Sequence, residues 1–443
     1  MMKNAILLGF SGFCAKSFDF IFRAFYSRSL GQEGMGLLSL GFGIHGVMLT
    51  VSTAGLGVAV SKTVSAYLVK KDYGAVRESM NLALYAVISL SFFVILLTFF
   101  GAEWMAKNIL GDVRVATSLC CLAPSILFMG ISYCLKGYFY ARRRVCIPAS
   151  SEFLEQAVKG CLISLFLQLF LKKGIEYGCT AVFLGITLGE LSSCFYLLLF
   201  YLRERGELSS QTTETGIGRE LFKISFPAML TSLTGSVLRM QEEVWIISAL
   251  KRYGMSHGEA VSNLGVLHGM VMPMLVFPLT LIGSVTTLLV PEISRADALT
   301  DRKRLRNMTR RIYSFGLLAG GAVLLLFQVF PVEISRIIYQ DVTIVPMVRT
   351  LSLLCPLMFL DSLSCAILNG MGKQFSMLCY SLLDSLLRLA GISLFVSSFG
   401  MGAMEGIVVF SNLFTCALTV RKVLKRQGIF SKQKCQKIKR RCS

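Results

Sequence analysis

Long apolar segments recur along almost the whole chain, and they limit what it can fold into. Runs of roughly twenty mostly apolar residues follow one another with short polar breaks, and about twenty such residues are what an α-helix needs to cross a bilayer. The composition agrees, because 54% of the residues are apolar, 16% are charged and the mean hydropathy is +0.65. The sequence therefore predicts an all-α integral membrane protein.

The apolar segments predict about twelve membrane-spanning helices. Their ranges are Asn4–Ser27, Gly34–Val60, Ala75–Phe100, Val115–Tyr140, Pro148–Leu171, Gly178–Leu202, Leu221–Leu250, Ala260–Val290, Arg311–Phe330, Pro346–Asn369, Phe375–Ser398 and Gly402–Val423.

The chain has a net charge of +20, and its basic residues are distributed according to the predicted order of the helices. Most Lys and Arg residues outside the helices stand at the two termini and in the loops after even-numbered helices, for example Arg142–Arg144 and the basic stretch Asp301–Arg311. Under the positive-inside rule, this distribution predicts a multi-pass protein of the cytoplasmic membrane with both termini in the cytoplasm. We expect the basic tail to be solvated or to touch anionic membrane lipids, and we expect no nucleic-acid partner.

Motifs for enzymatic chemistry are missing from the sequence. The fourteen cysteines form no CxxC or His-paired metal spacing, and there is no nucleotide-binding loop and no catalytic Ser, His and Asp pattern. His45 and His268 stand alone in apolar segments, where packing is one interpretation and ion binding or proton transfer another. The sequence thus predicts a protein that is not an enzyme and has no catalytic residues, metal site or cofactor.

An internal repeat divides the chain into halves. Residues 59–79 align without gaps to residues 289–309, Pro124 aligns with Pro356, and the Glu155 and Lys159 pair aligns with Asp384 and Arg388. We predict an N-terminal six-helix lobe at 1–205, a cytoplasmic linker at 206–220, a C-terminal six-helix lobe at 221–425 and a basic tail at 426–443. Two parallel six-helix bundles around a central cavity are an architecture of alternating-access transporters.

Three stretches also resemble a known family. They are Ser29–Lys62, "GYFYARRRVCIPASSEFLEQAVK" from Gly137, and "ILNGMGKQ" from Ile367. They are similar to polysaccharide transporters of the stage V sporulation protein B type, which belong to the MOP (multidrug/oligosaccharidyl-lipid/polysaccharide) flippase superfamily together with the lipid II flippase MurJ and the MATE multidrug transporters. The resemblance implies a MATE- and MurJ-like fold. It also implies a flippase for lipid-linked oligosaccharide or peptidoglycan and polysaccharide precursors.

Three charges interrupt the first apolar segment. At 100° per residue, Lys16 and Arg23 lie about 20° apart around the helix, and Asp19 lies about 60° from Lys16. Each charge at the centre of a helix would cost about 2.5 to 3.5 kcal/mol against lipid, so the shared face should look into the bundle. One interpretation is a cavity wall that binds an anionic diphosphate, and the other is a self-neutralising cluster that fixes packing.

A second charged group stands in the seventh segment, where Arg239 and Glu242 are further candidates for substrate binding. The resemblance implies an ion site formed by Glu243 of this segment and Asp384 of the eleventh. The alternative is two buried ion pairs, Arg239 with Glu243 and Asp384 with Arg388. The Glu155 and Lys159 pair is interpreted as structural. Coupling to Na⁺, to H⁺ or to the membrane potential is left open.

The sequence is compatible with three classes of function. The leading one is a flippase whose substrate is a polyprenyl-diphosphate-linked saccharide, with envelope or spore-assembly proteins as further partners. The alternative is a cation-coupled MATE-like multidrug antiporter, which Asp19, Glu242 and Glu243 would suit because organic cations favour acidic, aromatic cavities. The third is a non-transporting membrane partner in envelope assembly, which would tolerate loss of every buried charge.

Overall fold

A computed structural model describes residues 2–206, 216–280, 282, 290, 292–295 and 302–426. These residues form α-helices with short 3-10 and π turns, and no strand occurs among them. Most of the predicted linker and nearly all of the predicted tail, residues 207–215 and 427–443, lie outside the described residues. The predicted all-α class is confirmed for the described part of the chain.

Contacts divide the chain into two compact units. The N-terminal unit comprises Ile21–Ile247 and Ser256–Gly269, and the C-terminal unit comprises Met1–Phe20, Ser248–Met255 and Met270–Ser443. The predicted lobes at 1–205 and 221–425, with the linker between them, stay a prediction.

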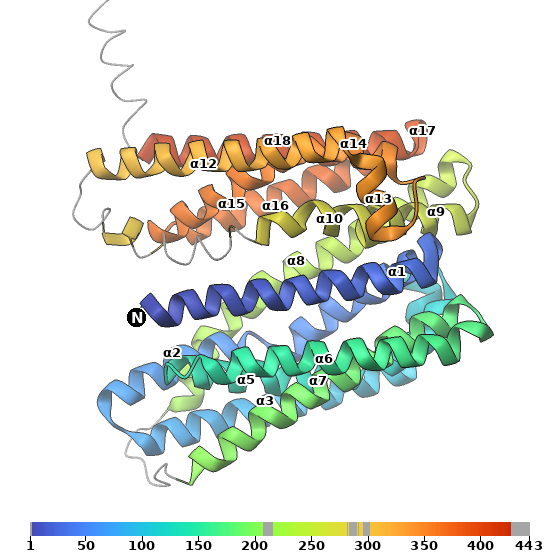
Figure 1. The fold of residues 1–443 in the computed structure, drawn as a ribbon. Coiled ribbons are helices and arrows are strands. Elements are labelled where there is room, and N and C mark those ends of the chain that lie inside the picture. The colour runs from blue at the N-terminus through green and yellow to red at the C-terminus, as the bar shows by residue number, and fades with distance from the viewer. Residues whose placement is uncertain are drawn as a thin grey trace, which may run out of the picture. The chain divides into compact units, whose positions relative to one another are not determined.

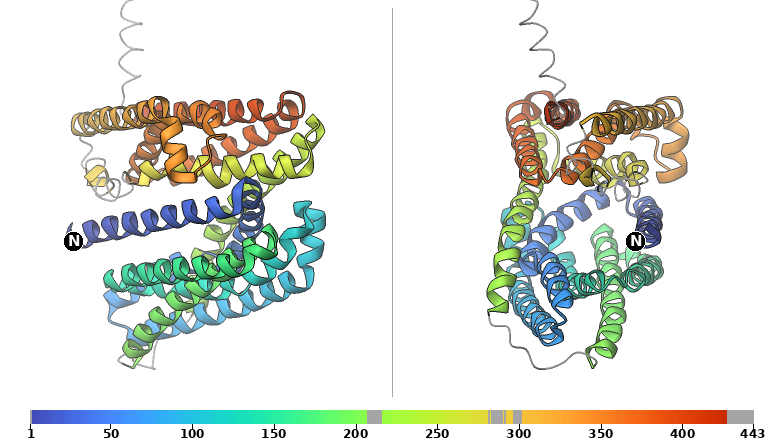
Figure 2. Two further views of the ribbon diagram at one scale, coloured as in Figure 1. Left: turned by 45° about the vertical axis from the view of Figure 1, so that its right-hand side comes forward. Right: turned by 90° about the vertical axis from the view of Figure 1, so that its left-hand side faces the viewer.

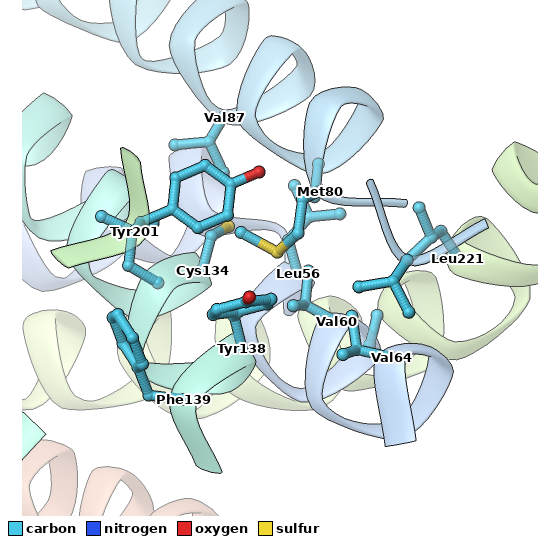
Figure 3. Close-up of a cluster of buried hydrophobic side chains, with 14 of the residues drawn as sticks. Leu56, Val60, Val64, Met80, Val87, Cys134, Tyr138, Phe139, Tyr201 and Leu221 are labelled. Carbon is cyan, nitrogen blue, oxygen red and sulfur yellow. The ribbon is translucent and has the colours of Figure 1, made fainter. Parts of the chain in front are cut away.

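The N-terminal unit is a bundle of helices (Figure 1) with a cluster of buried apolar side chains among them. Figure 3 shows part of this core, in which Tyr138 and Phe139 of α5 pack with Tyr201 of α7, Met80 of α3 and Val60 of α2. The helices are α1 (Met2–Thr53) from Ile21 onward, α2 (Leu56–Lys70), α3 (Tyr73–Trp104), α4 (Ala116–Leu122), α5 (Ser125–Ala141), α6 (Cys146–Phe170), α7 (Ile175–Arg205), α8 (Ile217–Tyr253) as far as Ile247, and α9 (His257–Leu264).

In the C-terminal unit, α15 contacts both α12 and α18, and α16 also packs on α18 (Figure 2). Phe359 and Leu363 of α15 form its core with Ile312 of α12 and Val423 of α18. The beginning of α1 belongs to this unit, where Phe20 stacks on Phe277 with ring centroids 4.5 Å apart. The other helices are α10 (Met272–Val276), α12 (Arg302–Val329), α13 (Pro331–Tyr339), α14 (Val345–Ser352), α15 (Leu354–Gly370), α16 (Gln374–Gly391), α17 (Ser397–Phe399) and α18 (Met401–Arg426).

Nine helical stretches of the described residues are long and apolar enough to cross a membrane, or eleven when each of two bent helix pairs counts as one span. Every predicted span overlaps one of them. One stretch, Ser11–Lys70, has 60 residues and contains both the first and the second predicted span. At 1.5 Å per residue it is far longer than one crossing, and Gly31, whose backbone is not helical, interrupts it between the two predicted spans.

The second predicted span differs in detail from the structure. We predicted an uninterrupted helix over Gly34–Val60, but α1 ends at Thr53 and a new helix begins at Leu56. Gly55 has a φ of +68°, and a Cβ built there would lie 2.7 Å from the carbonyl oxygen of Ser225 in α8. Only glycine suits both the positive φ and the close approach of the Ser225 backbone at this corner. The apolar periodicity of the sequence does not indicate this break.

A network of ion pairs and hydrogen bonds connects three segments of the N-terminal unit that are far apart in the sequence. The side chain of Arg114 donates to both carboxylate oxygens of Asp112, at 3.0 and 2.7 Å, and to Glu33 Oε1 at 2.7 Å. The His257 ring nitrogen Nε2 lies 2.9 Å from Asp112 Oδ2. Burial by itself raises the pKa of Asp112, but the hydrogen bonds from Arg114 and His257 outweigh it and hold that pKa below its ordinary value.

We expect Asp112→Asn to destabilise the protein by about 2 kcal/mol, since hydrogen bonds to charged groups contribute about 1.5–3 kcal/mol and Arg114 is partly exposed. Because the folded-state pKa is depressed, the stabilisation is complete above the unfolded value of 3.8 and is lost as the pH falls through the folded value. Thermal unfolding in detergent at several pH values measures this. The variant should unfold earlier than the wild type near neutral pH, and the difference should shrink below about pH 4.

The matched control is Asp341→Asn, since Asp341 lies in an exposed turn and accepts hydrogen bonds from Thr343. Its effect should stay within about 0.5 kcal/mol. An Asp112→Asn protein as stable as the wild type at neutral pH would contradict the network's role.

Candidate ion and substrate sites in the membrane helices

Glu243 forms the centre of one candidate site, in the N-terminal unit. Its Oε1 lies 3.5 Å from His268 Nδ1, and the Glu243 side chain is 13% exposed. His268 stands in a π-helical turn, Gly265–Val271, which directly follows α9. Single π turns interrupt the regular phase of a helix and are frequent at functional sites. A buried acid that faces a histidine can exchange a proton or bind a cation.

The second oxygen of Glu243 is held against the backbone of α1. Oε2 is buried without a hydrogen-bond partner among the described residues. A Cβ built on Gly43 would lie only 2.3 Å from this oxygen, so the absence of a side chain at Gly43 makes room for the carboxylate. Burying a carboxylate oxygen without a hydrogen-bond partner destabilises the folded protein, and a bound cation or proton would offset that free energy.

The neighbouring charges of α8 have different surroundings. Glu242 is buried, with 5% of its surface exposed, whereas Arg239 is exposed. Arg239 interacts electrostatically with Glu243 one turn away, although the ion-pair partner found for Glu243 is His268. The predicted roles of Arg239 and Glu242 in substrate binding stay predictions.

The charges of α1 lie in its continuous helical part before Gly31. Lys16 is exposed, and Asp19 and Arg23 are half-buried. Next to Arg23, the ring of Phe22 packs directly on Gly160 of α6, so closely that a Cβ there would meet the ring. This contact fixes the rotation of α1 against the bundle. The predicted common face of the three charges, and its role in binding substrate, stay predictions.

Asp384, the second predicted ion-site residue, lies in the C-terminal unit. Its Oδ1 accepts a hydrogen bond from Thr415 at 3.1 Å, and its Oδ2 lies 3.2 Å from Arg388 Nε. Asp361, which the sequence left unassigned, accepts from Thr419 at 2.9 Å and interacts electrostatically with Asp384. Carboxylate and hydroxyl oxygens from α15, α16 and α18 could hold a hard cation. No cluster of three or more His, Cys, Asp or Glu side chains suited to a metal ion occurs among the described residues.

A further group of charges lies around Glu190, a single acid of the sixth predicted span that the sequence left unassigned. Glu190 of α7 is buried and interacts electrostatically with Glu155 of α6. Lys136 of α5 lies 3.3 Å from Glu152 and interacts with both Glu155 and Glu190. The internal repeat drew attention to Glu155, because it aligns with Asp384, but the sequence does not show that Glu190 of another helix interacts with Glu155 and Lys136.

The family is shown by comparison with known proteins. The family model described as polysaccharide biosynthesis protein matches residues 1–297. The chain belongs to this family. Its helical, multi-pass architecture and the earlier resemblance agree with that assignment.

Two curated relatives and one solved structure extend the comparison. Stage V sporulation protein B of Bacillus subtilis (strain 168) is 27% identical over 439 residues, which cover 96% of this chain and 84% of the relative. Lipid II flippase MurJ of the same bacterium is 20% identical over 229 residues, 49% of this chain and 42% of the relative. An inward-facing multidrug resistance MATE transporter of the MOP superfamily matches 96% of this chain and 99% of its own, with a TM-score of 0.78 and 12% identity. At that identity, the likeness shows the fold alone.

Proposed function

We propose that this protein is a flippase that moves a lipid-linked saccharide, a polyprenyl-diphosphate precursor of the cell envelope, across the cytoplasmic membrane by alternating access. Membership of the polysaccharide biosynthesis protein family, shown over residues 1–297, carries the proposal. A relative named as a lipid II flippase supports the substrate class. The cations inside α1 suit it chemically, because Arg23 can offer two parallel hydrogen bonds to a diphosphate and Lys16 a point charge.

The proposal includes an orientation and a coupling step. Both termini would lie in the cytoplasm, with the basic segment that opens α12 on the same side. Labelling of an Arg304→Cys protein from outside the cell would contradict this orientation. Glu243, with His268 beside it, and Asp384 would bind Na⁺ or H⁺, and so connect a gradient to the lobe movement.

The buried acids of α8 favour a second candidate function, a MATE-like antiporter. Glu242 and Glu243 lie inside a membrane-spanning helix, where an acidic site could bind an organic cation, as a MATE-like antiporter would require.

Transport by purified protein in liposomes tests these functions against one another. We expect the protein to move a fluorescent undecaprenyl-diphosphate saccharide between leaflets and not to extrude ethidium. Depletion in cells should lead to accumulation of the lipid-linked precursor. Dye extrusion without lipid movement would support the antiporter, and neither activity would point to a non-transporting partner in envelope assembly.

A further inference from the structure

A polar stripe runs along α5 of the N-terminal unit, within a bent helix pair that is long and apolar enough to cross a membrane. Tyr133, Lys136 and Tyr140 follow one another at steps of three and four residues, so they lie on one side of the helix. Tyr133 and Tyr140 are 47% and 38% exposed. Both tyrosines interact electrostatically with Lys136 and with Glu152 of α6. The stripe thus combines exposed aromatic surface with charge.

A second stripe, on α6, lies opposite the first. Glu152 and Gln156 are one turn apart on this helix, and Glu152 Oε1 lies 3.3 Å from Lys136 Nζ. The side-chain oxygen Oε1 of Gln156 is buried and has no hydrogen-bond partner among the described residues. An ammonium and a carboxylate can each take part in several hydrogen bonds, so the contact between Lys136 and Glu152 leaves capacity for water or a ligand.

Helix α7 packs on both α5 and α6. Its Gly189 lies so close to α6 that a Cβ there would be 3.2 Å from the carbonyl oxygen of Glu155. The next residue, Glu190, is buried and interacts electrostatically with Glu155 and Lys136. Charges from three helices therefore meet at this place. The α5–α6 polar face is the name used below for Tyr133, Lys136, Tyr140, Glu152, Glu155 and Gln156.

The charges of the α5–α6 polar face limit what can cover it. A charge held against lipid near the centre of a helix would cost up to about 3.5 kcal/mol, yet the side chains of Lys136 and Glu152 are 16% and 32% exposed. The face therefore meets water or a polar ligand rather than hydrocarbon. The carboxylates of Glu152, Glu155 and Glu190 nearly balance the cations of Lys136 and Lys159, which disfavours a strongly charged ligand of either sign.

Neutral ligands rich in hydroxyl groups suit such a face. A hydroxyl group can donate to a carboxylate or amide oxygen and accept from an ammonium, so a saccharide could bridge Lys136, Glu152 and Gln156 without adding a charge. The apolar C–H faces of pyranose rings pack on aromatic rings, and a tyrosine combines such a ring with a polar hydroxyl. Tyr133 and Tyr140 offer both on the same side of α5.

The α5–α6 polar face also lies close to the helix that is proposed to bind the diphosphate. Phe22, which precedes Arg23 on α1, packs its ring on Gly160 of α6. Gly160 is one turn, about 6 Å, beyond Gln156 on that helix. In a diphosphate-linked saccharide the first sugar is bonded directly to a phosphate, so the two groups must be bound side by side. We propose that the α5–α6 polar face binds the saccharide of the transported lipid, an inference that rests on the proposed function.

Binding of two short-chain lipids, one with a sugar and one without, tests the inference. The probes are N-acetylglucosamine linked through a diphosphate to farnesol, and farnesyl diphosphate, each titrated into the purified intact chain in detergent. We expect Tyr133→Ala and Gln156→Leu to weaken binding of the saccharide probe about tenfold and to leave binding of farnesyl diphosphate unchanged. The matched controls are Tyr85→Ala, at a position of α3 that is 72% exposed, and Gln168→Leu, at an exposed position further along α6. Neither control should change the affinity for either probe.

Unchanged binding of farnesyl diphosphate also reports that the variants are folded, and Arg23→Ala should weaken both probes alike. The inference would be overturned if the wild type did not bind the saccharide probe, or if Tyr133→Ala and Gln156→Leu weakened both probes equally or neither. Saturable ethidium binding that Tyr133→Ala abolishes would also overturn it, because the face would then be a site for organic cations.

Failure of the inference and failure of the proposed function give different results. If the wild type moves no lipid in liposomes but the two probes bind as expected, the proposed transport fails and the saccharide site remains. If the wild type moves the lipid-linked saccharide but Tyr133→Ala and Gln156→Leu bind both probes normally, the saccharide site fails and the proposed transport remains.

Discussion

Glu243→Gln is expected to lower the transport rate by about ten- to a hundredfold while the protein still folds. The glutamine keeps the shape of the side chain, but it removes the charge that faces His268 at 3.5 Å and the acceptor that Oε2 presents beside Gly43. Hydrogen bonds to charged groups contribute about 1.5–3 kcal/mol, and each 1.4 kcal/mol changes an equilibrium tenfold. The initial rate of lipid movement, normalised to reconstituted protein, measures the effect at several pH values and Na⁺ concentrations.

Gly43→Ala should reproduce much of this loss with every ionisable group intact, because the added methyl group would lie 2.3 Å from Glu243 Oε2 and displace the carboxylate. Gly46→Ala, three residues further along α1, is the control, since its Cβ meets nothing within 4 Å. If both alanine variants transport equally well and Glu243→Gln still responds to pH and Na⁺ as the wild type does, Glu243 has no part in coupling.

The membrane helices could be predicted from sequence because the bilayer sets their length. About twenty apolar residues are needed whatever the helix packs against, so each predicted span overlaps a helical stretch of the structure. The break at Ala54 and Gly55 could not be predicted in this way. It depends on the approach of Ser225 from α8, a contact between segments far apart in the chain.

Partners of buried charges were harder to predict than the charges themselves. Glu243 stands out in an apolar segment, but its neighbour His268 lies in another segment, and the π turn at Gly265–Val271 shifts the side chains that follow relative to a regular helix. The pairing of Asp384 with Arg388 was predictable because both residues lie on one helix, four positions apart. Contacts within a helix can be predicted from the helical repeat of about 3.6 residues per turn. Contacts between helices depend on how each helix is rotated about its own axis, which a single sequence does not give.

Arg23→Ala is expected to reduce lipid movement by at least about a hundredfold at a normal level of protein in the membrane. A guanidinium can give a diphosphate two parallel charged hydrogen bonds, each of which contributes about 1.5–3 kcal/mol. Arg23→Lys should recover only part of the activity, because an ammonium keeps the charge but loses the planar fork. Membrane content and flipping in liposomes are measured together. Arg28→Ala, an exposed position later on α1, is the control and should transport normally.

Asp19→Asn separates the three interpretations of this helix. If α1 binds the diphosphate, Asp19 only positions its basic neighbours, and its loss should cost less activity than the loss of Arg23. A drug antiporter predicts the reverse order, because the acid would then meet the cation. A packing cluster predicts that Asp19→Asn combined with Arg23→Gln restores what either change loses, since the pair is removed together and no buried charge is left alone. Full transport by an Arg23→Ala protein made at normal level would rule out the diphosphate role, whatever the other two variants do.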